Sequence, residues 1–200
     1  AVIESKNDEP LHAYLAEGAH AFARIATLPC PTVAAINGAA LGGGLEIAMH
    51  CDAMIAALPG ANEKPYRVGL PEAGLGLCPG WGGTQMLPAR IDPALAIRMT
   101  ATGETVKVTD APAGLFDGVV SDAGSLLSAC AKWIKDHPKA TARTHPRALD
   151  ERPEAVRAGL AVVQKDLPAT LAAQAVVEAV EAGLDSGWKE GIAAERRWFG

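Results

Sequence analysis

The sequence predicts an α/β fold with a helical C-terminal region. Two short runs rich in alanine and β-branched residues, 32–37 and 52–57, match buried strands bounded by turn residues. Amphipathic helical patterns alternate with these runs. No strand-like run follows Pro138, so we expect an α/β core over residues 1–138 and a helical region over residues 139–200.

Composition restricts the class of protein. The 200 residues are 49% hydrophobic, which can fill the core of one domain, and the net charge is −5. No basic block is long enough to follow a nucleic-acid backbone, and no uncharged stretch approaches the length of a membrane span. We therefore expect a folded cytoplasmic protein, with neither nucleic acid nor a membrane as its partner.

The four cysteines and five histidines are scattered along the chain, and no C-x-x-C pair occurs. This spacing is typical of buried thiols in a reducing compartment, and it favours neither a disulfide framework nor a metal site. His50 lies nearest to the glycine-rich segment described below, and we expect it to have a structural role.

The first predicted element is an amphipathic helix over 11–28, which ends before Pro29. The strand at 32–37 follows, then a helix from near Gly43 and the strand at 52–57. The further predicted elements are a loop at 58–65, helices at 91–102, 109–115, 126–134, 153–165, 168–185 and 187–198, and a strand end at Val119–Val120.

Residues Asn37–Cys51, NGAALGGGLEIAMHC, form the segment around which the chain is organised. Its three consecutive glycines allow a tight turn and close approach to another molecule. A helix that starts there presents unpaired amide groups, which suit an oxygen that becomes negative during a reaction, and Glu46 lies within reach. The alternative is an ordinary strand-to-helix turn with Glu46 on a solvated face. The glycine spacing does not match the dinucleotide-binding fingerprint.

A second segment, Tyr66–Arg90, surrounds Glu72 with glycines and prolines, which predicts a shaped loop instead of a regular helix or central strand. Within it, Gly82-Gly83-Thr84 is expected to open a short helix whose amides point toward the same region. Two carboxylates, Glu46 and Glu72, each beside a glycine-rich turn, suit general acid/base chemistry on a carbonyl compound.

Both segments resemble motifs of the crotonase or enoyl-CoA hydratase superfamily. They read INGAALGGGLEIAMHCD at Ile36–Asp52 and GLPEAGLGLCPGWGGTQMLPAR at Gly69–Arg90. The second is similar to the hydratase part of multifunctional fatty-acid oxidation enzymes, and EGIAAERRWF near the C-terminus resembles a closing helix of the family. The resemblance implies a spiral of ββα units with a helical trimerisation region.

The resemblance also implies an acyl-CoA thioester substrate, with coenzyme A as part of that substrate and no separate cofactor or metal, and a homotrimer or dimer of trimers. It assigns water activation to Glu46 and proton delivery at Cα to Glu72, for syn addition of water across the 2,3 double bond. The Gly43 amide would contribute to the oxyanion hole, and the Gly80 backbone would help to seat the water. The positions that match substrate-binding residues are Ala39, Leu41, Gly42, Pro71, Pro79 and Trp81.

In the family, another oxyanion donor lies in an AGAD-like segment upstream of the helix expected at 11–28. The sequence begins after that point, so we expect the chain alone to have an incomplete site and an open sheet edge. Three functions remain open. Two carboxylates favour an enoyl-CoA hydratase of fatty-acid or related acyl-CoA degradation; the alternatives are an enoyl-CoA isomerase or other crotonase-type enzyme, and a catalytically silent oligomeric partner.

Overall fold

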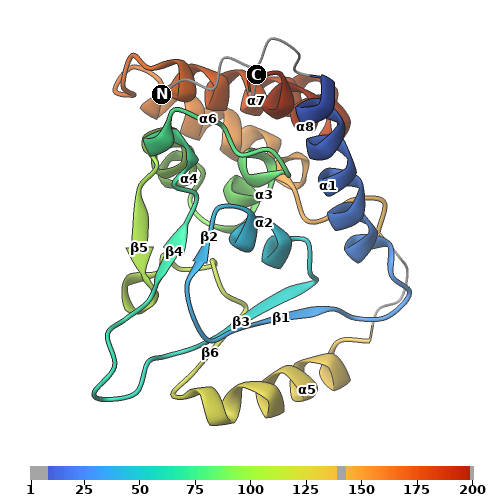
Figure 1. The fold of residues 1–200 in the computed structure, drawn as a ribbon, viewed down its shortest axis with the longest axis vertical. Helices are drawn as coiled ribbons and strands as arrows, with labels where there is room; N and C mark the ends of the chain where they lie inside the picture. Colours follow the sequence, from blue (N-terminus) through green and yellow to red (C-terminus); the bar gives the residue numbers. More distant parts are fainter. Residues whose placement is uncertain (1–8, 139–142, 199–200) are drawn as a thin grey trace.

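The computed structural model describes residues 9–138 and 143–198, in which helices alternate with short strands (Figure 1). The α-helices are α1 (Glu9–Thr27), α2 (Gly43–Met49), α3 (Gly83–Arg90), α4 (Pro93–Thr102), α5 (Leu126–Asp136), α6 (Pro153–Val163), α7 (Leu171–Ser186) and α8 (Trp188–Arg197). The strands are β1 (Val33–Ile36), β2 (Ala40–Leu41), β3 (Ala53–Ala57), β4 (Arg67–Gly69), β5 (Thr105–Lys107) and β6 (Gly118–Val120). Single 3-10 turns are η1 (Glu72–Leu75), η2 (Val108–Asp110), η3 (Ala123–Ser125) and η4 (Leu149–Glu151).

The strands form two small sheets. One has the order β1-β3-β6 and is parallel, with Ile36 paired to Ala56. The other has the order β2-β4-β5, in which β4 runs parallel to β2 and antiparallel to β5. Every residue of β3 is buried, because α5 contacts one face of its sheet and α2 lies over the other (Figure 1). Burial on both faces explains why this strand is a continuous apolar run.

The turn between β2 and α2 is made by Gly42, whose φ of 54° lies in the left-handed region that favours glycine. The Gly42 amide donates to the Gly69 carbonyl at 3.0 Å. This bond joins the start of α2 to the end of β4, and Glu72 follows shortly after that strand. The backbone therefore brings the two glycine-rich segments together before any side chain is considered.

The predicted C-terminal helical region is present as α6, α7 and α8, which lie at the end of the molecule opposite α5 (Figure 1). These helices share a core with α4, in which Ile97 packs with Val156, Leu160 and Val180. Within residues 9–138 and 143–198, no helix is both long and apolar enough to cross a membrane.

Several sequence predictions need correction. The sequence does not predict β2, β4 or β5, because strands of two or three residues are too short to show alternation. The helix expected at 109–115 is wrong beyond one turn: η2 ends at Asp110, and Gly114 adopts a φ of 89°. None of the four cysteines is in a disulfide, but Cys30 is exposed and Cys51 is only partly buried, so the expectation of buried thiols holds for Cys78 and Cys130 alone.

Helices α4 and α6 approach each other closely at Gly159. A Cβ atom added to Gly159 would lie 2.7 Å from the Ala94 nitrogen and 3.0 Å from the Pro93 carbonyl carbon. These are backbone atoms of α4, which cannot turn away as the end of a side chain can. The close packing of the two helices therefore requires a residue without a side chain at this position.

We predict that Gly159→Ala lowers the free energy of unfolding by about 1–3 kcal/mol, because the added methyl group forces α6 away from α4. Urea unfolding followed by circular dichroism measures the change. The control is Gly44→Ala in α2, where no neighbouring atom lies within 4 Å of the added carbon and no such loss is expected. Equal stability of the two variants would contradict the packing argument.

Candidate active site

Glu46 lies in the first turn of α2 and is 1% exposed. Its Oε1 accepts hydrogen bonds from the amides of Trp81, at 2.9 Å, and Gly83, at 2.8 Å. Its Oε2 has no hydrogen-bond partner in the described part of the chain. The interpretation of Glu46 as an acid on a solvated face is therefore wrong. One oxygen is held by the backbone and the other is available to a reactant.

Glu72 begins η1 and lies beside the turn that starts α2. Its Oε1 would be only 2.7 Å from a Cβ atom at Gly42, so glycine at that position lets the carboxylate approach the helix start. The Glu72 Oε2 is buried without a hydrogen-bond partner among the described residues. The amide of Gly43, at the same helix start, also has no acceptor in the described ranges. A free donor and a free carboxylate oxygen thus occur near the same turn.

Burial is the main cause of the unusual electrostatics of this site. It raises the pKa of Glu46 well above its usual range, and the charges of Glu195 and Glu72 raise that pKa further. The amides of Gly83 and Trp81 act in the opposite direction, since they stabilise the carboxylate. Burial also raises the pKa of Glu72. Each of these carboxyls therefore keeps its proton to a higher pH than an exposed glutamate does.

The sequence does not reveal a further acid of the site, Glu195 of α8, which is fully buried. Its Oε2 accepts from the Gly82 amide at 2.7 Å, and its Oε1 accepts from the Thr84 amide at 2.8 Å and the Thr84 hydroxyl at 2.5 Å. Burial raises the pKa of Glu195 to about 7. One signal in the sequence could have indicated it: Glu195 follows Gly191 and Ile192 by four and three residues, so it lies on the buried face of the helix.

Trp81 and His50 complete the immediate surroundings. The Trp81 carbonyl accepts from His50 Nε2 at 2.9 Å, and the Trp81 indole N–H donates to the Leu15 carbonyl at 3.2 Å. The indole ring is wedged between two helices, because a Cβ atom at Gly18 of α1 or at Gly43 of α2 would lie within 2.6 Å of it. His50 is thus buried against the Trp81 carbonyl, and burial lowers its pKa, which favours the neutral imidazole. Its structural role stays a prediction.

Two prolines and a glycine among the predicted site residues frame the two carboxylates. Pro71 immediately precedes Glu72 at the start of η1. Pro79 is buried, and a Cβ atom at Gly83 would lie 2.9 Å from the Cβ of Pro79. Gly80 is buried between Pro79 and Trp81. These positions belong to the same cluster as Glu46.

The remaining predicted substrate positions lie further out. Leu41 of β2 pairs with Gly69 and is 39% exposed. Ala39 is exposed in the turn before β2 and is absent from the hydrogen bonds and close approaches that define the cluster. The structure thus gathers Gly42, Gly43 and Trp81 around the carboxylates, whereas Leu41 and Ala39 are exposed and lie outside this cluster.

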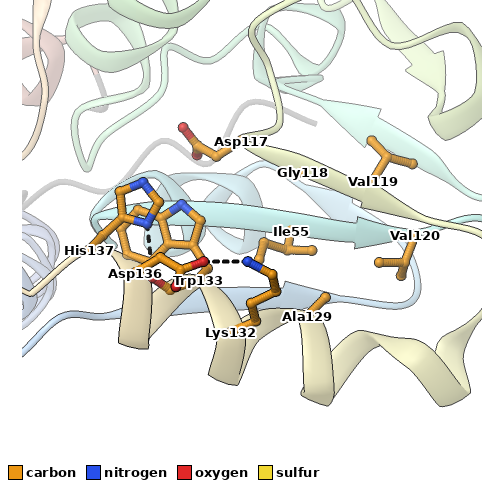
Figure 2. A pocket seen from close by; sticks show the side chains of 10 residues that line it. All are labelled: Ile55, Asp117, Gly118, Val119, Val120, Ala129, Lys132, Trp133, Asp136 and His137. Atoms are coloured by element: carbon orange, nitrogen blue, oxygen red, sulfur yellow. Dashed lines mark hydrogen bonds and ion pairs between the residues drawn. The ribbon is translucent and has the colours of Figure 1, made fainter.

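A hollow of about 330 Å³ lies elsewhere, between α5 and the strands β3 and β6 (Figure 2). On its floor, Trp133 stacks on His137 with ring centroids 4.3 Å apart, and Lys132 pairs with Asp136. The acid on its upper wall, Asp117, is engaged by Arg90 at 3.0 Å. None of the predicted site residues lines this hollow, so it does not contribute to the carboxylate site. In the part of the chain that the structure describes, no group of three or more histidines, cysteines or acids is arranged to hold a metal ion.

Comparison with known proteins supports the fold. The model of the enoyl-CoA hydratase/isomerase family matches residues 3–198. An enoyl-CoA hydratase structure from Bacillus anthracis is 26% identical to this chain with a TM-score of 0.58. The matched region covers 96% of this chain and 62% of that protein. The enoyl-CoA hydratase subunit I of Geobacillus kaustophilus HTA426 is 29% identical with a TM-score of 0.54, and the match covers 96% of this chain and 61% of that protein. The enoyl-CoA hydratase of Mycobacterium smegmatis is 31% identical with a TM-score of 0.50, and the match covers 84% of this chain and 63% of that protein.

The chain therefore spans less than two thirds of the length of these three proteins. The family match over nearly the whole chain confirms the resemblance inferred from the two glycine-rich motifs. The similar structures confirm the α/β fold class and its helical C-terminal region.

The buried carboxyl of Glu195 makes stability depend on pH. Its pKa is about 7 in the folded protein and near 4.5 without the surrounding fold, so between these values the folded protein keeps a proton that the unfolded chain has released. The contribution of Glu195 to the free energy of unfolding should therefore be largest below about pH 4.5. It should fall by about 3 kcal/mol as the pH rises from there through 7. Urea unfolding at pH 5 and pH 8 measures the difference. This difference in unfolding free energy should be smaller in Glu195→Gln. It should be unchanged in the control Glu190→Gln, which lies on the exposed face of the same helix. An undiminished difference in Glu195→Gln would refute the assignment of the pH dependence to Glu195.

Proposed function

Since the chain belongs to the enoyl-CoA hydratase/isomerase family, we propose that it is an enoyl-CoA hydratase, which adds water across the 2,3 double bond of a 2-enoyl-CoA thioester. The observation that carries the proposal is the pair of carboxylates, Glu46 and Glu72, that flank the turn at Gly42 and Gly43. Moving a double bond needs one group to carry a proton between two carbons. Hydration uses two groups, one for the water and one for Cα, and we assign these roles to Glu46 and Glu72.

In the proposed reaction, ionised Glu46 takes a proton from a water molecule through its free Oε2 while the water oxygen bonds to C3. The electron pair of the double bond moves toward the thioester oxygen, where the free Gly43 amide stabilises the developing charge, an effect worth about 3–4 kcal/mol. The enolate collapses and C2 takes a proton from neutral Glu72. Glu46 is left protonated and Glu72 ionised, and proton exchange with solvent restores the starting state.

The electrostatics support the acid role of Glu72, because burial raises its pKa and so favours the neutral form that delivers a proton. Burial also raises the pKa of Glu46 well above its usual range, and the two amides on Oε1 oppose that shift. The base role of Glu46 therefore rests on its geometry, with Oε1 held by these amides and Oε2 unpaired. We propose that Gly80 helps to seat the water next to these amides, and that Ala39, Leu41, Gly42, Pro71, Pro79 and Trp81 contact the thioester.

The wider proposals concern the biological setting. The structures named as enoyl-CoA hydratases at 26–31% identity support an acyl-CoA substrate, with coenzyme A carried by that substrate and no separate cofactor. We propose a role in fatty-acid or related acyl-CoA degradation, and association as a homotrimer or dimer of trimers through residues 139–200. Because none of the four cysteines is in a disulfide, we propose a reducing compartment, the cytoplasm.

Loss of either carboxylate should abolish most of the activity. We predict that Glu46→Gln and Glu72→Gln each lower kcat for crotonyl-CoA by about 10²–10⁴-fold, because each removes one proton-transfer step. The decrease in absorbance of the conjugated enoyl thioester measures the rate, with a longer 2-enoyl-CoA assayed in parallel. The control is Glu181→Gln, an exposed acid on α7, which should retain full activity.

The same assay separates the alternatives. Conversion of a 3-enoyl-CoA to the conjugated 2-enoyl-CoA, without hydration, would show an isomerase and contradict the two-carboxylate mechanism. Absence of turnover with all of these thioesters, by a chain that folds and assembles, would instead support the silent-partner interpretation.

A further inference from the structure

The backbone amides of residues 81–84 bind two different carboxylates in alternation. The Trp81 and Gly83 amides donate to Glu46, whereas the Gly82 and Thr84 amides donate to Glu195. All four distances lie between 2.7 and 2.9 Å. Both acids are at most 1% exposed, so neither set of bonds is shared with bulk solvent.

This alternation couples the two carboxylates mechanically. The four amides belong to one short segment that opens α3, with Gly82 at a φ of 109°, so a displacement of the segment changes the bonds to both acids. Glu195 reaches the segment from α8, whereas Glu46 reaches it from α2. The Thr84 hydroxyl adds a third bond to Glu195 Oε1. The position of the segment relative to Glu46 is therefore determined from both sides.

We propose that Glu195 is a positioning residue for the hydration proposed above: it holds the Gly82 and Thr84 amides so that the Trp81 and Gly83 amides fix Glu46. Because both carboxyls are buried on the same segment, the charge of Glu195 also raises the pKa of Glu46. The inference rests on the proposed function. Glu195 touches neither substrate nor water in this scheme, and it acts through the 81–84 segment and through its charge.

Other titratable groups face the same region and must be considered. Glu72 of η1 and the buried thiol of Cys78 interact electrostatically with Glu195. Arg196, the next residue of α8, is partly buried and forms no ion pair with Glu195 within the described ranges. Among the described residues of α8, no basic side chain forms an ion pair with Glu195. The repulsion between Glu195 and Glu46 is therefore not offset by a charge from this helix.

A purely structural role is the competing explanation, because any buried acceptor for the first amides of α3 stabilises that helix. The two explanations differ in what depends on charge. A structural acceptor affects stability whatever its charge, whereas the proposed role also changes the pH at which Glu46 becomes ionised. The pH dependence of the reaction separates them.

The test compares Glu195→Gln and Glu195→Asp by the pH profile of kcat/KM for crotonyl-CoA hydration. Removing the negative charge in Glu195→Gln should shift the acidic limb, which reports Glu46 ionisation, to lower pH by about one unit. Loosening of the segment should lower kcat by about 10–100-fold with little change in KM. Glu195→Asp retains the charge, so its acidic limb should stay in place while part of kcat is recovered. The exposed control, Glu190→Gln, should match the unchanged protein.

An acidic limb that does not move in Glu195→Gln, or that moves equally in both variants, would overturn the proposal and leave a structural role only. If Glu195→Gln does not fold, Thr84→Val removes the hydroxyl that stabilises the Glu195 anion, with Thr84→Ser as its matched control. The valine variant should shift the limb in the same direction by a smaller amount, and an unshifted limb would count against the proposal.

A second readout distinguishes failure of this inference from failure of the proposed function. Carbon-13 NMR of the glutamate-labelled protein follows the Glu46 carboxyl directly, with Glu46→Gln to assign its signal. Its titration should move to lower pH in Glu195→Gln even if the chain hydrates no enoyl thioester. Absence of turnover with this shift present would reject the hydratase alone, whereas an unmoved titration would reject the coupling between Glu195 and Glu46.

Discussion

The need to satisfy the buried amides of residues 81–84 underlies the arrangement of the whole site. Unpaired buried amides are costly. Glu46 and Glu195 accept from these four, one from α2 and one from α8. Two carboxylates that would be unfavourable in a dry interior are in turn stabilised by charge-assisted bonds. The acid that we assign to catalysis is thus buried because the fold requires an acceptor at its position.

Local patterns in the sequence predicted much of the fold. The helical spacing of α1, α5 and α7 is visible because each buries one face, and β1 and β3 are visible because each is an apolar run bounded by turns. Glu46 and Glu72 were identified for a similar reason. Each adjoins glycines that leave space for a close approach, and the structure shows that space at Gly42, where the Glu72 carboxylate enters it. Their chemical roles remain predictions.

The features that the sequence did not predict depend on contacts between distant residues. Strands β2, β4 and β5 exist only because their partners hydrogen-bond to them, and two or three residues contain no periodic signal. Glu195 resembles any acid on an amphipathic helix until α8 is docked against the start of α3. Cys30 was expected to be buried because apolar residues surround it in the sequence, but its thiol is exposed in the folded chain.

The position of α8 in the chain has a consequence for biosynthesis. Thr84 is separated from Glu195 by 111 residues, so the ribosome releases the 81–84 segment long before the helix that supplies half of its acceptors. During this interval the first strands and α2 can form, but the Gly82 and Thr84 amides must remain hydrated, and α3 has no complete N-terminal cap. The 81–84 segment therefore matures late, and the nascent chain exposes it to chaperones and proteases until α8 emerges.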